Sequence, residues 1–180
     1  MAVAADVVRL LAVVSVVAGT WRSGVVGAAL FLLVLGGCVL PLALRLPAGL
    51  DAAYCATLLF AAWAAQLDWY VAIPGLDVVV HAVATGLIAV VATVALARWG
   101  AVVAPTGRAR VGVAVVVVGI GAVASVLWEL GEWAGHTFLD DRIQVGYSDT
   151  LGDLAAGVAG SVIAAALATR SLDLDAAGES

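Results

Sequence analysis

Residues 125–161 read SVLWELGEWAGHTFLDDRIQVGYSDTLGDLAAGVAGS, and this stretch decides how the rest of the chain is interpreted. It places four acidic side chains in or beside segments that are apolar enough to cross a lipid bilayer; these are Glu129, Glu132, Asp149 and Asp153. Ionisable groups in such segments are costly, so each of them needs a partner or a function. The stretch therefore predicts two membrane helices that carry a polar site.

The composition of the whole chain indicates an integral membrane protein. Of its 180 residues, 64% are hydrophobic and only 12% are charged, whereas roughly one quarter of the residues in soluble domains are charged. The mean hydropathy is +1.15. Several apolar runs reach the ~20 residues that a spanning helix needs, and they lack the alternation with period two that marks a β-barrel. We therefore expect an all-α, polytopic membrane helix bundle.

The apolar runs predict about six transmembrane helices. They cover residues 2–19, 24–44, 50–67, 77–98, 111–133 and 149–169. The first run could also be a secretory signal peptide, but no basic segment precedes it and Asp6 lies where that segment should be. We therefore expect a retained helix, a single transmembrane domain over residues 1–170, and an acidic cytoplasmic tail over residues 171–180.

Residues that break or cap helices mark the predicted ends of the spans. A loop with Pro105 and Gly107 separates the fourth run from the fifth. Gly135 is the expected terminator of the fifth helix, and Ser148 is the expected N-cap of the sixth. We find no sign of a soluble domain between these spans.

The arginines predict the orientation of the bundle. Six spans place both termini on one side of the membrane, and six arginines fall on that side: Arg9, Arg45, Arg98, Arg108, Arg110 and Arg170. Only Arg22 and Arg142 fall on the other side. By the positive-inside rule, both termini are expected in the cytoplasm.

With this topology, three helices bring ionisable side chains to one level near the outer surface. The residues are Asp77 and His81, Glu129 and Glu132, and Asp149 and Asp153. Within each helix the two are three or four positions apart, so they are neighbours on one face. His136 follows Glu132 by four positions, while Asp68 and Tyr147 lie in or beside the outer connections. We therefore predict one site with walls from three helices.

The charge balance on this side favours a cation as the ligand. Eight of the thirteen acids fall here, against two arginines, whereas a site for a bare phosphate or carboxylate should supply Arg or Lys. Carboxylates and Glu/His pairs that project inward from facing helices are typical of metal sites in bundles. Mixed carboxylate and imidazole ligation suits zinc or manganese, and carboxylates alone suit magnesium or calcium. The sequence leaves the choice of divalent metal open.

A structural interpretation stands beside this one. Acids at helix ends are often solvated, Asp149 and Asp153 could favour the positive end of a helix dipole, and Asp77 could be a cap. His81 is the hardest residue to explain structurally, because an isolated imidazole in an apolar segment needs a partner. The candidate partners are Asp77, Glu129 and Asp153.

Three motifs carry a resemblance to known families. LDWYVAIPGLDVVVHAVATG (67–86), LWELGEW (127–133) and GYSDTLGDLAAGVAG (146–160) resemble the uncharacterised YjdF-like family of bacterial inner-membrane proteins, and more remotely the VanZ-like family. The recurring features of the family fall here on Asp77, His81, Trp128, Glu129, Glu132, Asp149, Thr150 and Asp153. The family often has a polar residue after the first Asp, where this chain has Val78. The resemblance spans residues 66–165 and implies a multi-pass helical protein of the inner or plasma membrane, without a settled activity.

Three functions are compatible with the sequence. The first is an enzyme with an outward-facing divalent-cation site that catalyses hydrolysis or transfer on a lipid-linked envelope substrate. In such an enzyme the ligands or the general base would be His81, Glu129, Glu132, Asp149 and Asp153, with Tyr147 as a donor at the mouth. The second is a small transporter or ion-coupled carrier of a small molecule, although few polar residues lie deeper than the site. The third is a structural or partner-binding membrane protein.

Other partners receive less support from the residues. Nothing in the charge pattern resembles a nucleic-acid-binding patch, so the expected surroundings are the lipid bilayer. Cys38 and Cys55 lie inside apolar segments, where cysteines are most often small core residues. We assign them no function from the sequence.

Overall fold

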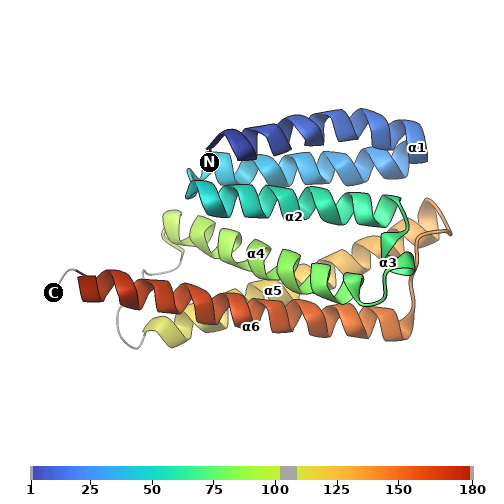
Figure 1. The fold of residues 1–180 in the computed structure, drawn as a ribbon. Coiled ribbons are helices and arrows are strands. Elements are labelled where there is room, and N and C mark those ends of the chain that lie inside the picture. Colours follow the sequence, from blue (N-terminus) through green and yellow to red (C-terminus); the bar gives the residue numbers. More distant parts are fainter. Residues whose placement is uncertain (1, 102–108, 179–180) are drawn as a thin grey trace. The chain divides into compact units, whose positions relative to one another are not determined.

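The computed structural model describes residues 2–101 and 109–178, and every element within these ranges is a helix (Figure 1). The helices are α1 (Ala2–Ala43), α2 (Ala48–Gln66), α3 (Trp69–Ala72), α4 (Leu76–Arg98), α5 (Ala109–Phe138) and α6 (Tyr147–Gly178). Five of these described helices, all but the four-residue α3, are long and apolar enough to cross a membrane. The predicted all-α membrane fold is thus confirmed. The loop predicted at Pro105 and Gly107 lies outside the described residues.

Helix α1 is a hairpin of two helical arms. Its backbone leaves the helical region at Ser23 (φ −131°, ψ 18°) and Gly24 (φ 57°, ψ −132°), and the positive φ at Gly24 favours glycine. A Cβ at Gly27 would collide with the backbone oxygen of Gly19, so the two arms touch beside the turn. Figure 1 shows the arms side by side. The predicted runs at residues 2–19 and 24–44 are therefore separate helical segments, and all six predicted runs are helical.

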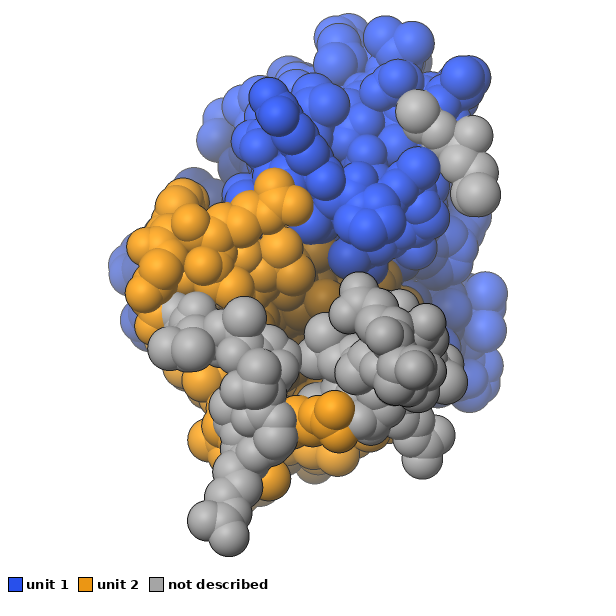
Figure 2. Space-filling view, turned by 90° about the vertical axis from the view of Figure 1, so that its left-hand side faces the viewer, with its two compact units in different colours: residues 1–80, 131–145 blue, residues 81–130, 146–180 orange. Residues whose placement is uncertain are grey.

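The contacts of the chain divide it into two compact units (Figure 2). Unit 1 comprises Met1–Val80 and Gly131–Val145. Its interior joins α1 to α2: the rings of Phe31 and Trp63 lie 4.9 Å apart, and Trp63 Nε1 donates a hydrogen bond to Ser15 Oγ at 2.9 Å. Large apolar side chains are therefore packed between these helices, with their polar atoms paired.

Unit 2 comprises His81–Leu130 and Gly146–Ser180. Small residues allow its helices to approach closely: a Cβ at Gly160 of α6 would collide with the backbone oxygen of Ala82 on α4. A Cβ at Gly121 of α5 would likewise collide with Ser161 Oγ on α6. Close backbone approach through small residues is the usual way in which membrane helices associate. This packing determines where the polar side chains of the unit meet.

Two predicted helix ends are wrong by about one turn or less. Helix α5 continues past Gly135 to Phe138, and the carbonyl oxygen of Gly135 accepts bonds from Leu139 N and Asp140 N, both at 2.9 Å. Helix α6 begins at Tyr147, so Ser148 lies inside the first turn and is not the N-cap. Glycine inside a helix costs only modest stability. The contacts of His136 with Ile143 and of Trp133 with Phe138 stabilise the extra turn.

Candidate functional site

The core of the site is an imidazole and a carboxylate on two helices of unit 2. His81 of α4 and Asp153 of α6 lie 3.3 Å apart, measured from Nδ1 to Oδ1. Their side chains are 13% and 5% exposed, and both helices are apolar enough to span a membrane. Asp153 is therefore a partner of the kind that His81 was expected to need. In an apolar segment such a pair stabilises both groups.

Asp77 extends this pair to a group of three. It lies one turn before His81 on the uninterrupted helix α4, so helix geometry places the two residues on one face. Asp77, His81 and Asp153 each offer one ligand atom, and these atoms lie within 4.8 Å of one another. This is the kind of cluster that can hold a metal ion.

Glycine on α6 explains why His81 and Asp153 meet. Gly157 and Gly160 follow Asp153 by four and seven positions and therefore share its face of the helix. Gly160 packs directly against the backbone of Ala82, the residue after His81. Since a side chain at Gly160 would collide there, α6 reaches α4 only because this position lacks a Cβ.

Helix α5 adds polar atoms beside this group. Ser125, which is 3% exposed, directs Oγ at the backbone of Gly157, where a Cβ would collide with it. Thr85 Oγ1 of α4 lies 3.1 Å from the same Cβ position. The hydroxyl groups of two helices therefore converge on Gly157, one turn deeper than Asp153 and His81.

Glu129 lies at the level of the His81 and Asp153 pair. Ser125 packs at Gly157 and Gly121 packs at Ser161, so residue numbers rise on α5 as they fall along α6 and the two helices are antiparallel. Glu129, one turn after Ser125, is thus level with Asp153, one turn before Gly157. Its Oε1 is buried and, within the described residues, has no hydrogen-bond partner. It is not a member of the group of three ligand atoms.

The remaining candidate residues are not brought into this group. Asp149 is exposed in the first turn of α6, where a carboxylate favours the positive end of the helix dipole. Tyr147 is 83% exposed, and Asp68 is an exposed residue with a left-handed backbone (φ 56°) before α3. The group of three does not include Glu132 or His136.

His136 has a structural contact in unit 1. Its Nδ1 lies 2.7 Å from the backbone oxygen of Ile143, which closes the loop after α5. The rings of Trp133 and Phe138 also meet edge to face at 5.9 Å, and together these contacts hold the final turn of α5. The side chain of His136 therefore stabilises the loop after α5.

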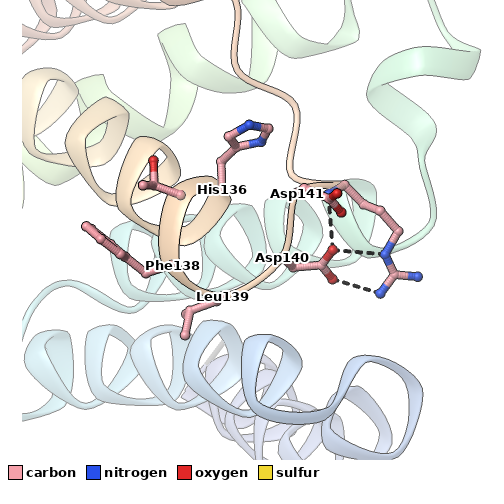
Figure 3. A pocket seen from close by; sticks show the side chains of 7 residues that line it. His136, Phe138, Leu139, Asp140 and Asp141 are labelled. Atoms are coloured by element: carbon pink, nitrogen blue, oxygen red, sulfur yellow. Dashed lines mark hydrogen bonds and ion pairs between the residues drawn. The ribbon is translucent and has the colours of Figure 1, made fainter.

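The loop after α5 contains an ion pair between Asp140 and Arg142. Figure 3 shows the pocket that residues 136–142 line at this position. Arg142 donates to Asp140 from Nε at 2.9 Å and from Nη2 at 2.7 Å, and its backbone N–H donates at 3.0 Å. The guanidinium lowers the pKa of Asp140 to about 2. Because Arg142 is bound in this way, it is unsuited to hold an anionic ligand elsewhere.

Two features of this arrangement were not found from the sequence. The first is the contact of Ser125 on α5 with Gly157 on α6, where a Cβ would collide with Ser125 Oγ. Arg9 and Asp51 form a second buried ion pair, in unit 1. Opposite charges in the first and third apolar runs were the available signal for that pair.

Comparison with known proteins identifies the family. The model of the family described as "Predicted membrane protein (DUF2238)" matches residues 1–174. No curated protein and no solved structure matches the chain. The match supports the expectation of an uncharacterised membrane protein family and does not test the resemblance to YjdF-like or VanZ-like proteins. With nearly its whole length covered, the chain belongs to the DUF2238 family of predicted membrane proteins.

Proposed function

We propose that this protein binds a divalent cation, with Asp77, His81 and Asp153 as its ligands. The observation that carries the proposal is the approach of three ligand atoms to within 4.8 Å of one another in two apolar helices. The 3.3 Å between His81 Nδ1 and Asp153 Oδ1 is close to the separation of about 3.4 Å expected for two ligands about 2.1 Å from a tetrahedral ion. One imidazole and two carboxylates suit zinc or manganese.

Electrostatics supports a cation at this position. His81 can supply at most one positive charge, whereas Asp77 and Asp153 carry two negative charges when ionised. A divalent ion with neutral His81 balances both carboxylates, and three protein ligands leave a position open for water or substrate, as in catalytic zinc sites.

The preferred activity for such a site is metal-dependent hydrolysis or transfer. The bound ion would act as a Lewis acid toward a carbonyl or phosphoryl group, and the buried carboxylate of Glu129 lies at the same level as the ligands. The substrate class that suits a site in membrane helices is a lipid-linked envelope compound.

A carrier receives less support from the interior of unit 2. The hydroxyl groups of Thr85 and Ser125 lie one turn deeper than the ligands, but Ala89, Val117 and Ala165 form a buried apolar cluster further along the same helices. A polar path through the unit would have to cross this cluster. The geometry therefore favours a site that loads and releases its ligand from one end.

The proposal is tested by metal binding to the purified protein in detergent. We expect about one zinc or manganese ion per chain by elemental analysis, and a large loss of affinity in Asp153→Asn by calorimetry. Asp149→Asn is the matched control, because Asp149 is an exposed carboxylate on the same helix. Equal and sub-stoichiometric metal in all three proteins would contradict the proposal. If Asp153→Asn lowered only the thermal stability, a purely structural function would be supported.

A further inference from the structure

We propose that Glu129 and Ser125 of α5 hold the water that occupies the open position of the cation. This inference rests on the proposed cation site, in which α4 and α6 supply every ligand. It assigns a separate task to α5, which is to position the exchangeable ligand of the ion. Ser125 thereby becomes a positioning residue.

The first step of the argument is the location of the two residues. Both belong to unit 2, and both lie on the face of α5 that packs against α6, because Ser125 contacts Gly157 and is four positions from Glu129. Glu129 is level with Asp153, and Ser125 lies one turn deeper. The two polar groups therefore lie on the α5 face that packs against α6, one at the level of Asp153 and the other one turn away.

The second step is that both side chains have an unused hydrogen-bonding atom. Ser125 Oγ and Glu129 Oε1 are buried and have no hydrogen-bond partner among the residues that the structure describes. Buried polar atoms are normally paired, and unpaired ones call for an explanation. For comparison, the buried hydroxyl of Ser161 donates to the carbonyl oxygen of Gly157 at 2.8 Å. The side chains of Ser125 and Glu129 thus have bonding capacity that local structure does not use.

The third step is chemical complementarity. A water molecule on a cation is polarised, so its two protons seek acceptors. A carboxylate is an acceptor only, while a hydroxyl group can donate or accept. Glu129 and Ser125 together can accept both protons of one cation-bound water. A small anion in the same position would meet the negative charge of Glu129 and the donor hydroxyl of Ser125.

Small anions therefore provide the test. The protein is loaded with Co²⁺ in detergent, and the visible absorption of the ion is followed as azide is added. We expect a spectral change in the wild type, because azide replaces the water. Glu129→Gln should strengthen azide binding about tenfold, since it removes a nearby negative charge. Ser125→Ala should weaken azide binding severalfold, since it removes a donor.

Two control variants separate these effects from general damage. Ser161→Ala removes a buried hydroxyl that is already paired within α6, and Asp149→Asn removes an exposed carboxylate of the same helix. Both should leave the azide affinity unchanged. Each variant is compared at equal Co²⁺ content. A thermal unfolding scan of a separate sample shows whether the variant is folded.

The outcomes distinguish the two proposals. If the wild type binds no Co²⁺, the proposed cation site is wrong. If Co²⁺ binds but Glu129→Gln and Ser125→Ala both respond to azide as the wild type does, only the inference about α5 is overturned. Loss of Co²⁺ binding in Glu129→Gln would also overturn it, because Glu129 would then be a ligand of the ion.

Discussion

Each unit of the molecule contains a buried acid, and the two acids are neutralised in different ways. In unit 1, Asp51 is paired with Arg9, whose Nε also donates to the carbonyl oxygen of Cys38 at 2.9 Å and whose Nη1 donates to Asp6 at 2.9 Å. Arginine is charged at every accessible pH. The pair in unit 1 is therefore permanent, and it connects both arms of α1 with α2.

In unit 2, Asp153 faces His81, and Asp77 lies one turn before His81 on α4. Histidine, unlike arginine, is a common metal ligand in proteins. Burying a carboxylate is costly in both units. In unit 1 the arginine Arg9 compensates the charge of Asp51, whereas in unit 2 Asp153 faces a histidine, which could also bind a metal. This difference is why we propose a structural function for the pair of Arg9 and Asp51 and a ligand-binding function for the group around His81 and Asp153.

The largest expected effect tests the permanence of the pair in unit 1. Arg9→Gln leaves Asp51 as an unpaired buried charge, so it should lower the free energy of unfolding by about 3–5 kcal/mol. Chemical unfolding in detergent, followed by tryptophan fluorescence, measures this change. The double variant with Arg9→Gln and Asp51→Asn should recover much of the loss. An Arg9→Gln protein as stable as the wild type would remove the contrast between the units.

The second effect concerns Asp153 as a ligand. Partners of metal ligands typically contribute 10–100-fold to affinity, so Asp153→Asn should weaken zinc binding by at least about 100-fold. In metal-free protein it should destabilise the fold less than Arg9→Gln does. Calorimetric titration with zinc and unfolding of the metal-free protein measure the two quantities. A variant that keeps full zinc affinity would exclude Asp153 from the site.

The third effect tests the close packing that brings the site together. Gly157→Ala places a methyl group against Ser125 Oγ, and overpacking of this kind costs about 1–3 kcal/mol. Gly152→Ala is the matched control on α6, because nothing lies within 4 Å of its Cβ position. Thermal unfolding of the two variants should show a loss for the first and none for the second. Equal melting temperatures would argue against the packing at Gly157.

The smallest effect concerns the exposed loop after α5. Arg142→Gln should raise the pKa of Asp140 from about 2 toward its ordinary value of about 3.9. Because the pKa of Asp140 is lowered in the folded protein, its contribution to stability is present above pH 4 and is lost as the pH falls toward 2. Titration of the carboxyl carbon by NMR measures the shift. An unchanged pKa would show that the pair is absent in solution.

The sequence predicts the helical fold well because apolar runs of sufficient length have few alternatives in a membrane. It places Asp77, His81 and Asp153 among six candidate ligands, because spacing within a helix and alternating topology bring all six to one level, but it does not separate these three from the others. It does not predict the end of α5, since the bond from His136 to Ile143 and the contact of Trp133 with Phe138 are tertiary. The pair of Arg9 and Asp51, whose members are 42 positions apart, was not predicted either, although opposite charges in two apolar runs were an available signal.

Which polar residues have unused bonding capacity cannot be derived from spacing. Glu132 and Glu129 are equivalent candidates in the sequence, and only the packing of α5 against Gly157 distinguishes Glu129. Asp149 and Asp153 are likewise one turn apart, yet Asp153 is buried and Asp149 is exposed. The direction in which each helix turns its polar face is set by contacts between helices.

X-ray absorption spectroscopy of the zinc-loaded protein tests the central claim most directly. We expect a shell of nitrogen and oxygen atoms about 2.0–2.1 Å from the ion, with the scattering of one imidazole from His81. A sulfur shell at about 2.3 Å would place the metal at the buried cysteines of unit 1, Cys38 and Cys55. That result, or a protein without bound zinc, would contradict a cation site at Asp77, His81 and Asp153.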